Sequence, residues 1–280
     1  MNNKYKSFSP NDISQQELHA YLLSAVAPRP ICLASTIDFK GNVNLSPFSF
    51  FNVFSSNPPI MIFSPARSGR DGSLKHTLQN VLEVPEVVIN IVSYNMVEQM
   101  SLASTAYKQD VNEFVKTGFR EIESEKVRPP RVDKAPVSFE CFVTKVIDLG
   151  NFPGAGNLII AEVTRIHINE NYLDEKGQLD IRELDLIGRM GGNWYTRSNG
   201  TALFEIPKPN KNQGIGVDNL PKEIRTSPIL TENNLGRLGN LPALPNISDI
   251  EKMKINLEVI PLLEKFSDEQ LNIEIHRLAQ

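Results

Sequence analysis

Two long apolar runs joined by a turn constrain the fold of this chain more than any other feature. Residues 139–149 and 158–168 are both rich in Val and Ile, whereas residues 150–157 between them contain three glycines and one proline. β-Branched residues favour strands, and a cluster of Gly, Pro and Asn between two such runs is typical of a turn. The pattern therefore predicts a long β-hairpin in the middle of the chain.

The remainder of residues 1–205 also favours strands that are joined by turns. Regular helices between successive strands are missing, which argues against a doubly wound parallel sheet. We expect a mainly β fold, a closed or split antiparallel barrel with a few accessory helices. The sequence predicts strands at residues 31–37, 43–54, 60–64 and 87–92, and helices at residues 75–83, 96–103 and directly after the capping box Ser14–Glu17.

The composition changes in the last 75 residues, which contain seven of the nineteen prolines and few strand-like runs. We therefore divide the chain into a barrel domain, residues 1–205, and a C-terminal extension, residues 206–280. Residues 208–246 are predicted to form an extended arm. Two capping boxes, Ser248–Glu251 and Ser267–Gln270, predict that one or two helices close the chain.

The charge balance and the cysteines narrow the class of protein. The formal net charge of −4 argues against nucleic acid as the main ligand, because such a ligand requires a basic face. Cys32 and Cys141 lie in apolar runs without Cys-x-x-Cys spacing, so we expect buried free thiols in a reducing compartment. Residues 1–9 lack an apolar signal core, and no apolar run is long enough to span a membrane. We expect a cytoplasmic protein with no membrane partner.

Several well-known catalytic motifs are absent from the sequence. There is no Gly-x-Gly-x-x-Gly after a strand and no Walker loop, which argues against a Rossmann domain and a P-loop nucleotidase. There is no Gly-x-Ser-x-Gly elbow, so nucleophilic catalysis has no visible machinery. No metal site is expected, because the four histidines lack metal-ligand spacing: His19, His76, His167 and His276.

Hydroxyl, amide and cationic side chains gather where the predicted strands end. Residues 44–52 offer backbone amides and the hydroxyls of Ser46 and Ser49, while Lys75 and Thr77 stand at the start of a predicted helix. Free amides and the positive dipole end at a helix start favour an anion. A phosphorylated ligand and a simple polar bend between two barrel strands both fit residues 44–52. Two more phosphate-binding candidates follow the strand at 60–64, namely Ser64 and Arg67.

Four segments resemble the flavin reductase-like family, which includes the flavoredoxins. The run Arg29–Thr36 and the run Asn44–Asn52 carry most of the likeness. Lys75–Asn80 is similar to a Lys-Asp-Thr-Leu-x-Asn stretch of that family, followed by a strand like Val87–Asn90. Gly188–Tyr195 resembles its Arg-x-Gly-Gly-x-x-Tyr stretch. The resemblance implies an FMN-binding split barrel of the Greek-key type. One departure is His76, where the family pattern has Asp.

The resemblance also implies a homodimer that binds one FMN per barrel near the dimer interface, with FMN favoured over FAD. Carried over by position, one set of residues would surround the phosphate and ribityl chain: Ser46, Pro47, Phe48, Ser49, Ser64, Arg67, Lys75 and Thr77. A second set would lie along the isoalloxazine ring: Thr36, Asn44, Pro47 and Phe48. A histidine at position 76 would leave the site unchanged if it points away from the phosphate, and would make it more positive if it faces it.

Three functions remain open at this point. In the first, flavin accepts electrons from NADH, NADPH or a redox protein and passes them to an acceptor, so no catalytic side chain is required. Arg189 and Tyr195 are then candidates for the substrate side that faces the nicotinamide or a partner, or else a loop cation and a packed barrel side chain. The second function is an FMN electron carrier without a nicotinamide site. The third is a cofactor-free barrel that acts as a binding module.

The C-terminal extension allows two interpretations. It wraps the second subunit and enlarges the dimer interface, or it covers the flavin and restricts access to electron acceptors.

Overall fold

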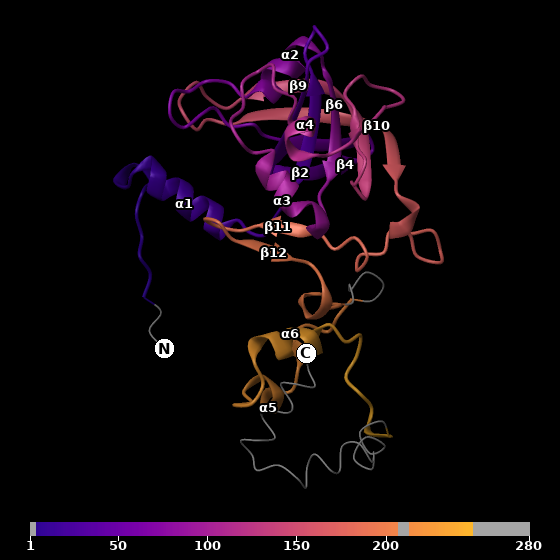
Figure 1. Ribbon diagram of the computed structural model, residues 1–280. Coiled ribbons are helices and arrows are strands. Elements are labelled where there is room, and N and C mark those ends of the chain that lie inside the picture. Colours follow the sequence, from indigo (N-terminus) through magenta and orange to yellow (C-terminus); the bar gives the residue numbers. More distant parts are fainter. Residues whose placement is uncertain (1–3, 207–212, 249–280) are drawn as a thin grey trace. The chain divides into compact units, whose positions relative to one another are not determined.

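A seven-stranded sheet forms the body of the first of two units into which the chain divides, residues 1–204 and 205–280. The structure, a computed structural model, describes residues 4–206 and 213–248 (Figure 1). Every pair of neighbouring strands in the sheet is antiparallel. In sheet order the strands are β3 (Val43–Phe48), β2 (Cys32–Ile37), β6 (Glu86–Ile91), β9 (Val137–Asp148), β10 (Asn157–Ile168), β5 (Pro59–Phe63) and β4 (Phe51–Ser56).

The two edge strands of this sheet, β3 and β4, follow each other in the chain with only Ser49 and Phe50 between them. The two edges therefore meet at this corner, and the sheet curls into a barrel that stays open between them. The bend is fixed by a hydrogen bond from the backbone N–H of Ser64 to the carbonyl of Phe50, 2.8 Å long. The mainly β, split-barrel fold expected from the sequence is confirmed. Residues 43–54, expected as one extended segment, are two strands.

The hairpin expected in the middle of the chain is formed by β9 and β10. Their register runs from Asn157 opposite Asp148 to Ile168 opposite Val137, with two irregularities along the way. Extra residues in one strand of a pair increase its twist and bend, which helps a sheet to close. Strand β6 lies between β2 and β9, in the interior position predicted from its continuous apolar run.

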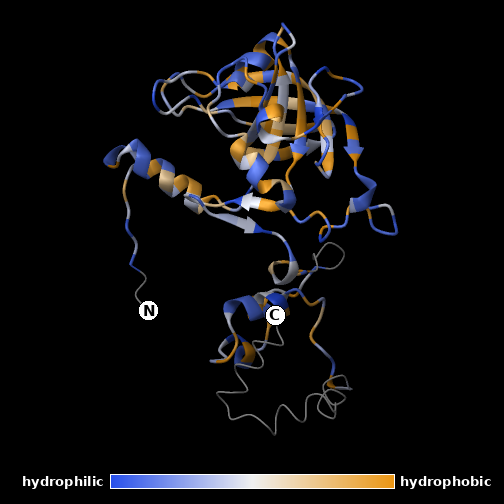
Figure 2. Ribbon diagram, viewed as in Figure 1, coloured by the Kyte–Doolittle hydropathy of each residue, from blue (hydrophilic) through white to orange (hydrophobic). Residues whose placement is uncertain are grey.

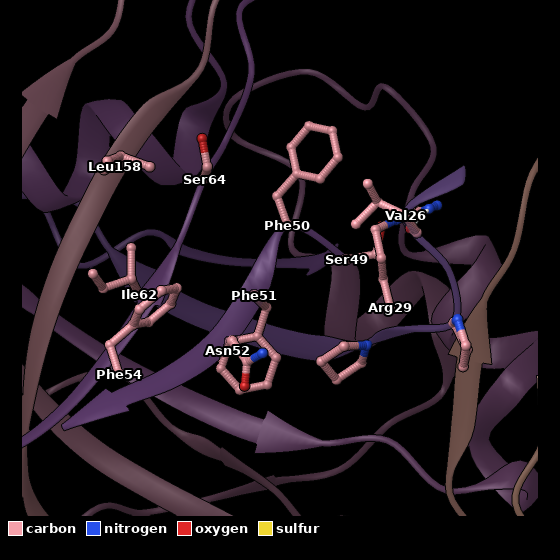
Figure 3. Close-up of a pocket in the computed structure, with 12 residues that line it drawn as sticks. Val26, Arg29, Ser49, Phe50, Phe51, Asn52, Phe54, Ile62, Ser64 and Leu158 are labelled. Atoms are coloured by element: carbon pink, nitrogen blue, oxygen red, sulfur yellow. Dashed lines mark hydrogen bonds between the residues drawn. The ribbon is translucent and has the colours of Figure 1, made fainter. Parts of the chain in front are cut away.

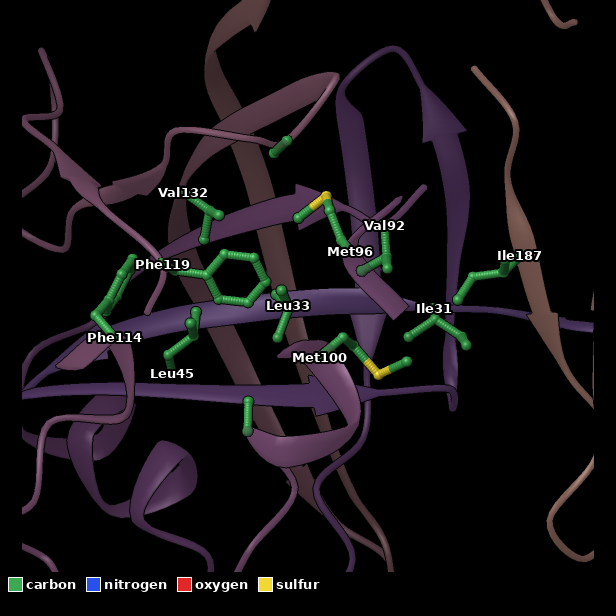
Figure 4. Close-up of a cluster of buried hydrophobic side chains, with 12 residues drawn as sticks. Ile31, Leu33, Leu45, Val92, Met96, Met100, Phe114, Phe119, Val132 and Ile187 are labelled. Carbon is green, nitrogen blue, oxygen red and sulfur yellow. The ribbon is translucent and has the colours of Figure 1, made fainter. Parts of the chain in front are cut away.

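Strand β2 is buried on both faces, because each face supports a separate core. Cys32 and Ala34 face the inside of the barrel, where they pack with residues of β6, β9, β10 and helix α2. Leu33 faces the outside and packs with Leu45 of β3 and Met100 of α3 (Figure 4). A fully buried leucine such as Leu33 or Leu45 contributes about 1.5–3 kcal/mol. This double burial explains why β2 reads as a continuous apolar segment rather than an alternating one.

Helices cover the barrel at a few places, as expected for accessory elements. The capping box at Ser14 is formed, with the backbone N–H of Glu17 donating to the Ser14 hydroxyl and the Glu17 carboxylate accepting from the Ser14 N–H. Helix α4 was not anticipated from the sequence. The α-helices of the first unit are α1 (Gln15–Ala25), α2 (His76–Glu83), α3 (Val97–Leu102) and α4 (Glu113–Thr117), and its 3-10 turns are η1 (Pro10–Asp12), η2 (Tyr94–Met96), η3 (Glu170–Tyr172) and η4 (Gly200–Ala202).

Two small sheets complete the first unit, and neither was anticipated from the sequence. In the three-stranded sheet, β11 lies between β1 and β12 and pairs antiparallel with both. This sheet brings the Gly188–Tyr195 segment beside Arg29, although more than 150 residues separate them in the chain. The strands are β1 (Arg29–Pro30), β11 (Ile187–Arg189) and β12 (Tyr195–Arg197), and the other pair is β7 (Glu121–Ile122) with β8 (Arg131–Val132).

The described part of the second unit contains short helices in the region where an extended arm was expected. They are η5 (Val217–Asn219), α5 (Lys222–Arg225) and α6 (Glu232–Gly239). A capping box at Thr231 and Asn234 starts α6, which is the local reason that this segment is helical. The closing helices expected from Ser248–Glu251 and Ser267–Gln270 lie outside the described residues, apart from Ser248.

Across residues 4–206 and 213–248, none of the helices combines the length and the apolar character that crossing a membrane would require.

Candidate functional site

A cavity of about 340 Å³ lies beside the bend that joins β3 to β4. Its volume is within the range of small-molecule sites, and its lining is mainly apolar, as is usual for such sites. Figure 3 shows Ser64 and Leu158 toward one end of this cavity and Ser49, Arg29 and Val26 toward the other. The lining residues are Val26, Pro28, Arg29, Pro30, Ser49, Phe50, Phe51, Asn52, Phe54, Ile62, Ser64 and Leu158.

Aromatic side chains form much of the cavity wall because β4 is an edge strand. Phe51 is half-buried, whereas Phe50 and Phe54 are exposed. Ile62 and Leu158, which alternate with the core residues of β5 and β10 and so lie on the outer face of the barrel, add aliphatic surface. Flat apolar walls of this kind suit a planar aromatic ligand, since stacking and area burial act together.

Arg29 is the cation of the cavity lining, and it is buried to 6% exposure. Its guanidinium donates to the carbonyl oxygens of Leu23, Val26 (2.7 Å) and Met190 (3.1 Å). Its Nε also donates to the hydroxyl of Ser49 at 3.4 Å. Burial lowers the pKa of Arg29, and the nearby positive charge of Arg189 lowers it further. These contacts join the end of α1, the start of β1 and the turn between β11 and β12.

Two serine hydroxyls lie at opposite ends of the cavity, and each accepts a hydrogen bond from the protein. The Ser49 hydroxyl accepts from Arg29, and the Ser64 hydroxyl accepts from the backbone N–H of Asn157 at 3.1 Å. A hydroxyl that accepts still has its own proton to donate. Both predicted serines can therefore donate to a ligand oxygen in the cavity.

The loop between β5 and α2 carries the cations predicted for a phosphate. The Arg67 guanidinium donates to the Gly150 carbonyl at 3.2 Å and to the Asn151 side chain at 3.2 Å, and forms an ion pair with Asp148 at 3.4 Å. Lys75 is exposed and occupies the N-cap of α2 without a side-chain capping bond. The first turn of α2 contains no acidic residue. The start of this helix is therefore positive and open to an anion.

The unusual histidine follows Lys75 at the start of α2. His76 is half-buried, and both its burial and the charge of Lys75 lower its pKa. At neutral pH this histidine is therefore mainly uncharged, so it adds little positive charge to the helix start.

Three of the predicted ligand residues belong to buried hydrogen-bond networks instead of the cavity lining. The Thr77 hydroxyl donates to the Asn44 side chain at 2.7 Å, and Asn44 donates to Glu113 at 2.9 Å. Elsewhere, Asn80 donates to the Thr36 hydroxyl at 3.1 Å. These groups are occupied within the protein. The structure therefore separates Thr36, Asn44 and Thr77 from Ser49 and Ser64.

Glu113 was not anticipated as part of any site, because it lies far from the other residues in the sequence. It is 3% exposed and accepts from Asn44 and from the backbone N–H of Leu45 at 3.0 Å. Leu45 belongs to the edge strand β3, so Glu113 satisfies an amide of that edge. Burial raises the pKa of Glu113 against the opposing effect of these hydrogen bonds.

The other predicted residues of β3 lie near the cavity without lining it. Ser46 and Pro47 are half-buried opposite Ala34 and Leu33 of β2. Phe48 packs against Phe63, with the ring centroids 5.3 Å apart. Their contribution is to position the bend at Ser49.

The predicted substrate residues meet each other beside Arg29. Arg189 and Tyr195 are register partners in β11 and β12, and the guanidinium of Arg189 lies 4.5 Å from the Tyr195 ring centroid. Arg189 is also the register partner of Arg29. Neither Arg189 nor Tyr195 lines the cavity, but they stand next to its cationic end.

Sequence reasoning missed several residues that form the cavity itself. Arg29 and Phe51 belong to the two segments that carry the family resemblance, but the sequence of a segment does not show which way a side chain points. Ile62 and Leu158 carried no functional signal, since apolar strand residues of this kind usually form the core. Taken together, the cavity offers apolar walls, two hydroxyl donors and a buried cation.

Known proteins are similar to this chain in sequence and in fold. Residues 24–183 match a family model described as flavin reductase like domain. A protein of Aquifex aeolicus with no characterised function is 35% identical over 68% of this chain and 94% of its own length. Among solved structures, nitrilotriacetate monooxygenase component B from Bacillus cereus is 28% identical, with a TM-score of 0.68 over 73% of this chain and 100% of its own. A split-barrel protein from Shewanella frigidimarina shares the fold, with a TM-score of 0.61 at 24% identity over 73% of this chain and 100% of its own.

Proposed function

The chain belongs to the flavin reductase-like family, a family of flavin-binding oxidoreductases, and on this premise we propose that its cavity binds FMN. In this proposal electrons pass from NAD(P)H or from a redox protein through the flavin to an acceptor. The observation that carries the proposal is the aromatic cavity with a buried cation at one end. The flavin supplies the redox chemistry, while the protein supplies binding and orientation.

The residues of the cavity fit the chemistry of a flavin. Phe50, Phe51 and Phe54 offer apolar surface for a flat ring system. Ser49 and Ser64 offer donors for carbonyl or ribityl oxygens at opposite ends. Because the isoalloxazine ring is planar and polar at one edge, this distribution of walls and donors suits it.

We assign the phosphate to the loop that leads into α2. Ser64, Arg67 and Lys75 are close together in sequence, and the start of α2 lacks an acidic residue. A helix start combined with a lysine is a common anion site. In this proposal Thr36, Asn44 and Thr77 hold β2, β3 and α2 in place through buried hydrogen bonds rather than contacting the ligand directly.

We also propose that Arg189 and Tyr195 form the side of the site that faces a nicotinamide or a redox partner. They stand next to the cationic end of the cavity through the pairing of β1 with β11. A stacked guanidinium and phenol present both a positive charge and an apolar face. Such a surface suits a phosphorylated aromatic donor.

A homodimer is part of the proposal, because the edge strand β4 exposes apolar side chains. Val53 and Phe54 on β4 are 61% and 64% exposed, and Phe50, in the bend directly before β4, is 41% exposed. An exposed edge strand with apolar side chains is a typical site of association. A second copy packed here would also cover the open side of the cavity wall formed by Phe50 and Phe54.

The visible absorption spectrum of the purified protein, recorded before and after anaerobic addition of NADPH or NADH, tests the proposal. Bound flavin that is bleached by one nucleotide is the expected result, and it names the donor. Flavin that binds but stays oxidised with both nucleotides would favour the electron carrier that takes electrons from another protein. A colourless protein that takes up no added FMN would refute the flavin proposal and favour a binding module.

A further inference from the structure

Arg29 has no acidic partner among the residues that the structure describes. Its hydrogen bonds go to neutral oxygens, those of three backbone carbonyls and the Ser49 hydroxyl. The neighbouring charge that influences its pKa is that of Arg189, which is also positive. Buried charges are normally paired, because removing an ion from water is costly. The Arg29 end of the cavity is therefore suited to a negative group supplied by a ligand.

The groups suited to a phosphate lie at the other end of the barrel. Lys75 and the start of α2 follow β5 and Ser64 in the chain. Figure 1 shows α2 at one end of the barrel and β11, which pairs with Arg29, at the opposite end. Within the cavity, Figure 3 likewise separates Ser64 from Arg29. A ligand whose phosphate lies toward Ser64 and Lys75 would therefore direct its ring toward Arg29.

We propose that Arg29 stabilises the negative charge that the flavin ring carries when it is reduced, and that Arg29 does not bind the phosphate. The inference rests on the proposed function. Hydride transfer from NAD(P)H moves two electrons and one proton to a neutral oxidised ring, which leaves NAD(P)⁺ and one net negative charge on the ring. A preorganised cation in a partly dry site stabilises such a developing charge more than it would in water.

The decisive experiment measures binding of oxidised and reduced flavin by wild type and by Arg29→Gln. Anaerobic titrations use FMN and riboflavin, which has no phosphate, each in its oxidised form and in the form reduced with dithionite. They give four affinities for each protein. We expect Arg29→Gln to weaken the reduced form about tenfold more than the oxidised form for both ligands. For a two-electron couple this equals a fall in midpoint potential of about 30 mV.

Arg67→Gln is the matched control, because Arg67 belongs to the phosphate end of the proposed site. It should weaken FMN equally in both oxidation states and leave riboflavin unaffected. If Arg29→Gln behaves in this way instead, Arg29 binds the phosphate and the inference is wrong. Equal weakening of all four affinities would assign Arg29 a purely structural role and would also overturn it.

Arg29 also joins α1 to the β11–β12 turn, so its loss could unfold the region. Arg29→Lys keeps the charge and should preserve most of the difference between the two oxidation states. Arg189→Gln removes the neighbouring cation without removing the carbonyl contacts, and should lower the potential in the same direction by a smaller amount. The inference is refuted if Arg189→Gln leaves the midpoint potential unchanged and a folded Arg29→Gln binds oxidised and reduced flavin with the affinities of the wild type. Failure of the wild type to bind any flavin would refute the proposed function instead.

Discussion

The side chains proposed for this site differ in their burial and in whether another residue already occupies their polar group. Lys75 is exposed at the start of α2, whereas Thr77, two residues later, is fully buried and bonded to Asn44. The sequence alone placed both in one phosphate site. The structure leaves the exposed cation free to meet a ligand and uses the buried hydroxyl to hold the sheet against the helix.

Lys75→Gln should weaken FMN binding by about two- to fivefold, the usual size of an exposed ion pair. Riboflavin affinity should not change, since it has no phosphate. Fluorescence titration with both ligands measures the effect, and the loss should shrink at high salt. Lys40→Gln, a substitution in the exposed turn after β2, is the control. A similar loss for riboflavin would mean that Lys75 does not meet the phosphate.

Glu113→Ala should lower the free energy of unfolding by about 2 kcal/mol, because it leaves the Leu45 N–H and the Asn44 amide without their acceptor. Urea denaturation measures this loss. Glu98→Ala on the exposed face of α3 is the control and should change stability by less than about 0.5 kcal/mol. Equal effects of the two substitutions would argue against the buried carboxylate as a structural acceptor.

The raised pKa of Glu113 also predicts a pH dependence with a definite sign. A carboxyl whose folded pKa lies above its unfolded pKa binds its proton more tightly in the folded state. Its contribution is therefore complete below its ordinary value of 4.5 and is lost as the pH rises through the higher folded value. Thermal melts of Glu113→Gln should show a smaller loss of stability across this window than wild type. An unchanged pH profile would contradict the assignment.

Among the α-helices of the first unit, α1 differs from α2, α3 and α4 because none of its residues is buried. Figure 2 shows hydrophobic residues along this helix, which Figure 1 shows projecting from the barrel. Its attachments are the Arg29 contacts at one end and a hydrogen bond from Gln15 to the Pro153 carbonyl at the other, 2.7 Å long. Short helices are marginal without tertiary packing. The stability of α1 should therefore depend on its N-cap at Ser14, whereas α2 is held by its buried residues.

Ser14→Ala should destabilise α1 by about 1 kcal/mol through loss of its N-cap. The effect should be local, with amide exchange in α1 about fivefold faster while the melting temperature of the barrel stays nearly unchanged. Ser14→Asp keeps a capping acceptor and should restore wild-type exchange. Exchange that is unchanged in Ser14→Ala would show that packing, rather than the cap, holds the helix.

At the scale of the whole molecule, the exposed strand β4 connects the cavity to assembly. Val53 lies on this strand and does not line the cavity. A substitution there can therefore test assembly without changing the cavity lining. Val53→Asp should raise the dissociation constant of the proposed homodimer at least about tenfold, because it places an unpaired charge in the interface. Sedimentation equilibrium measures this.

Phe39→Asp provides the control for this prediction, since Phe39 is 81% exposed in a turn away from β4. It should leave the association state unchanged. A protein that sediments as a monomer without either substitution would remove the homodimer from the proposal, and a Val53→Asp dimer as stable as wild type would place the interface elsewhere.

Several elements could be predicted because their signals in the sequence are local. The β9–β10 hairpin, the apolar strands β2 and β6 and the capping box of α1 each depend on residues close together in the chain. Periodicity and turn chemistry act over a few residues, so these patterns can be read directly. The resemblance of residues 29–36 and 44–52 also predicted the family, and the match to the family model and to known relatives confirms it.

Contacts between side chains that are distant in the sequence could not be predicted in this way and are known from the fold alone. The pairing of β1 with β11 brings Arg29 beside Arg189, and α4 brings Glu113 to Leu45 across 68 residues of sequence. Thr36, Asn44 and Thr77 are bonded within buried networks, whereas Arg29, although also buried, lines the cavity. The physical reason is that a side chain's role depends on its solvent exposure and on distant partners, and the chain encodes both only through the packing of the whole barrel.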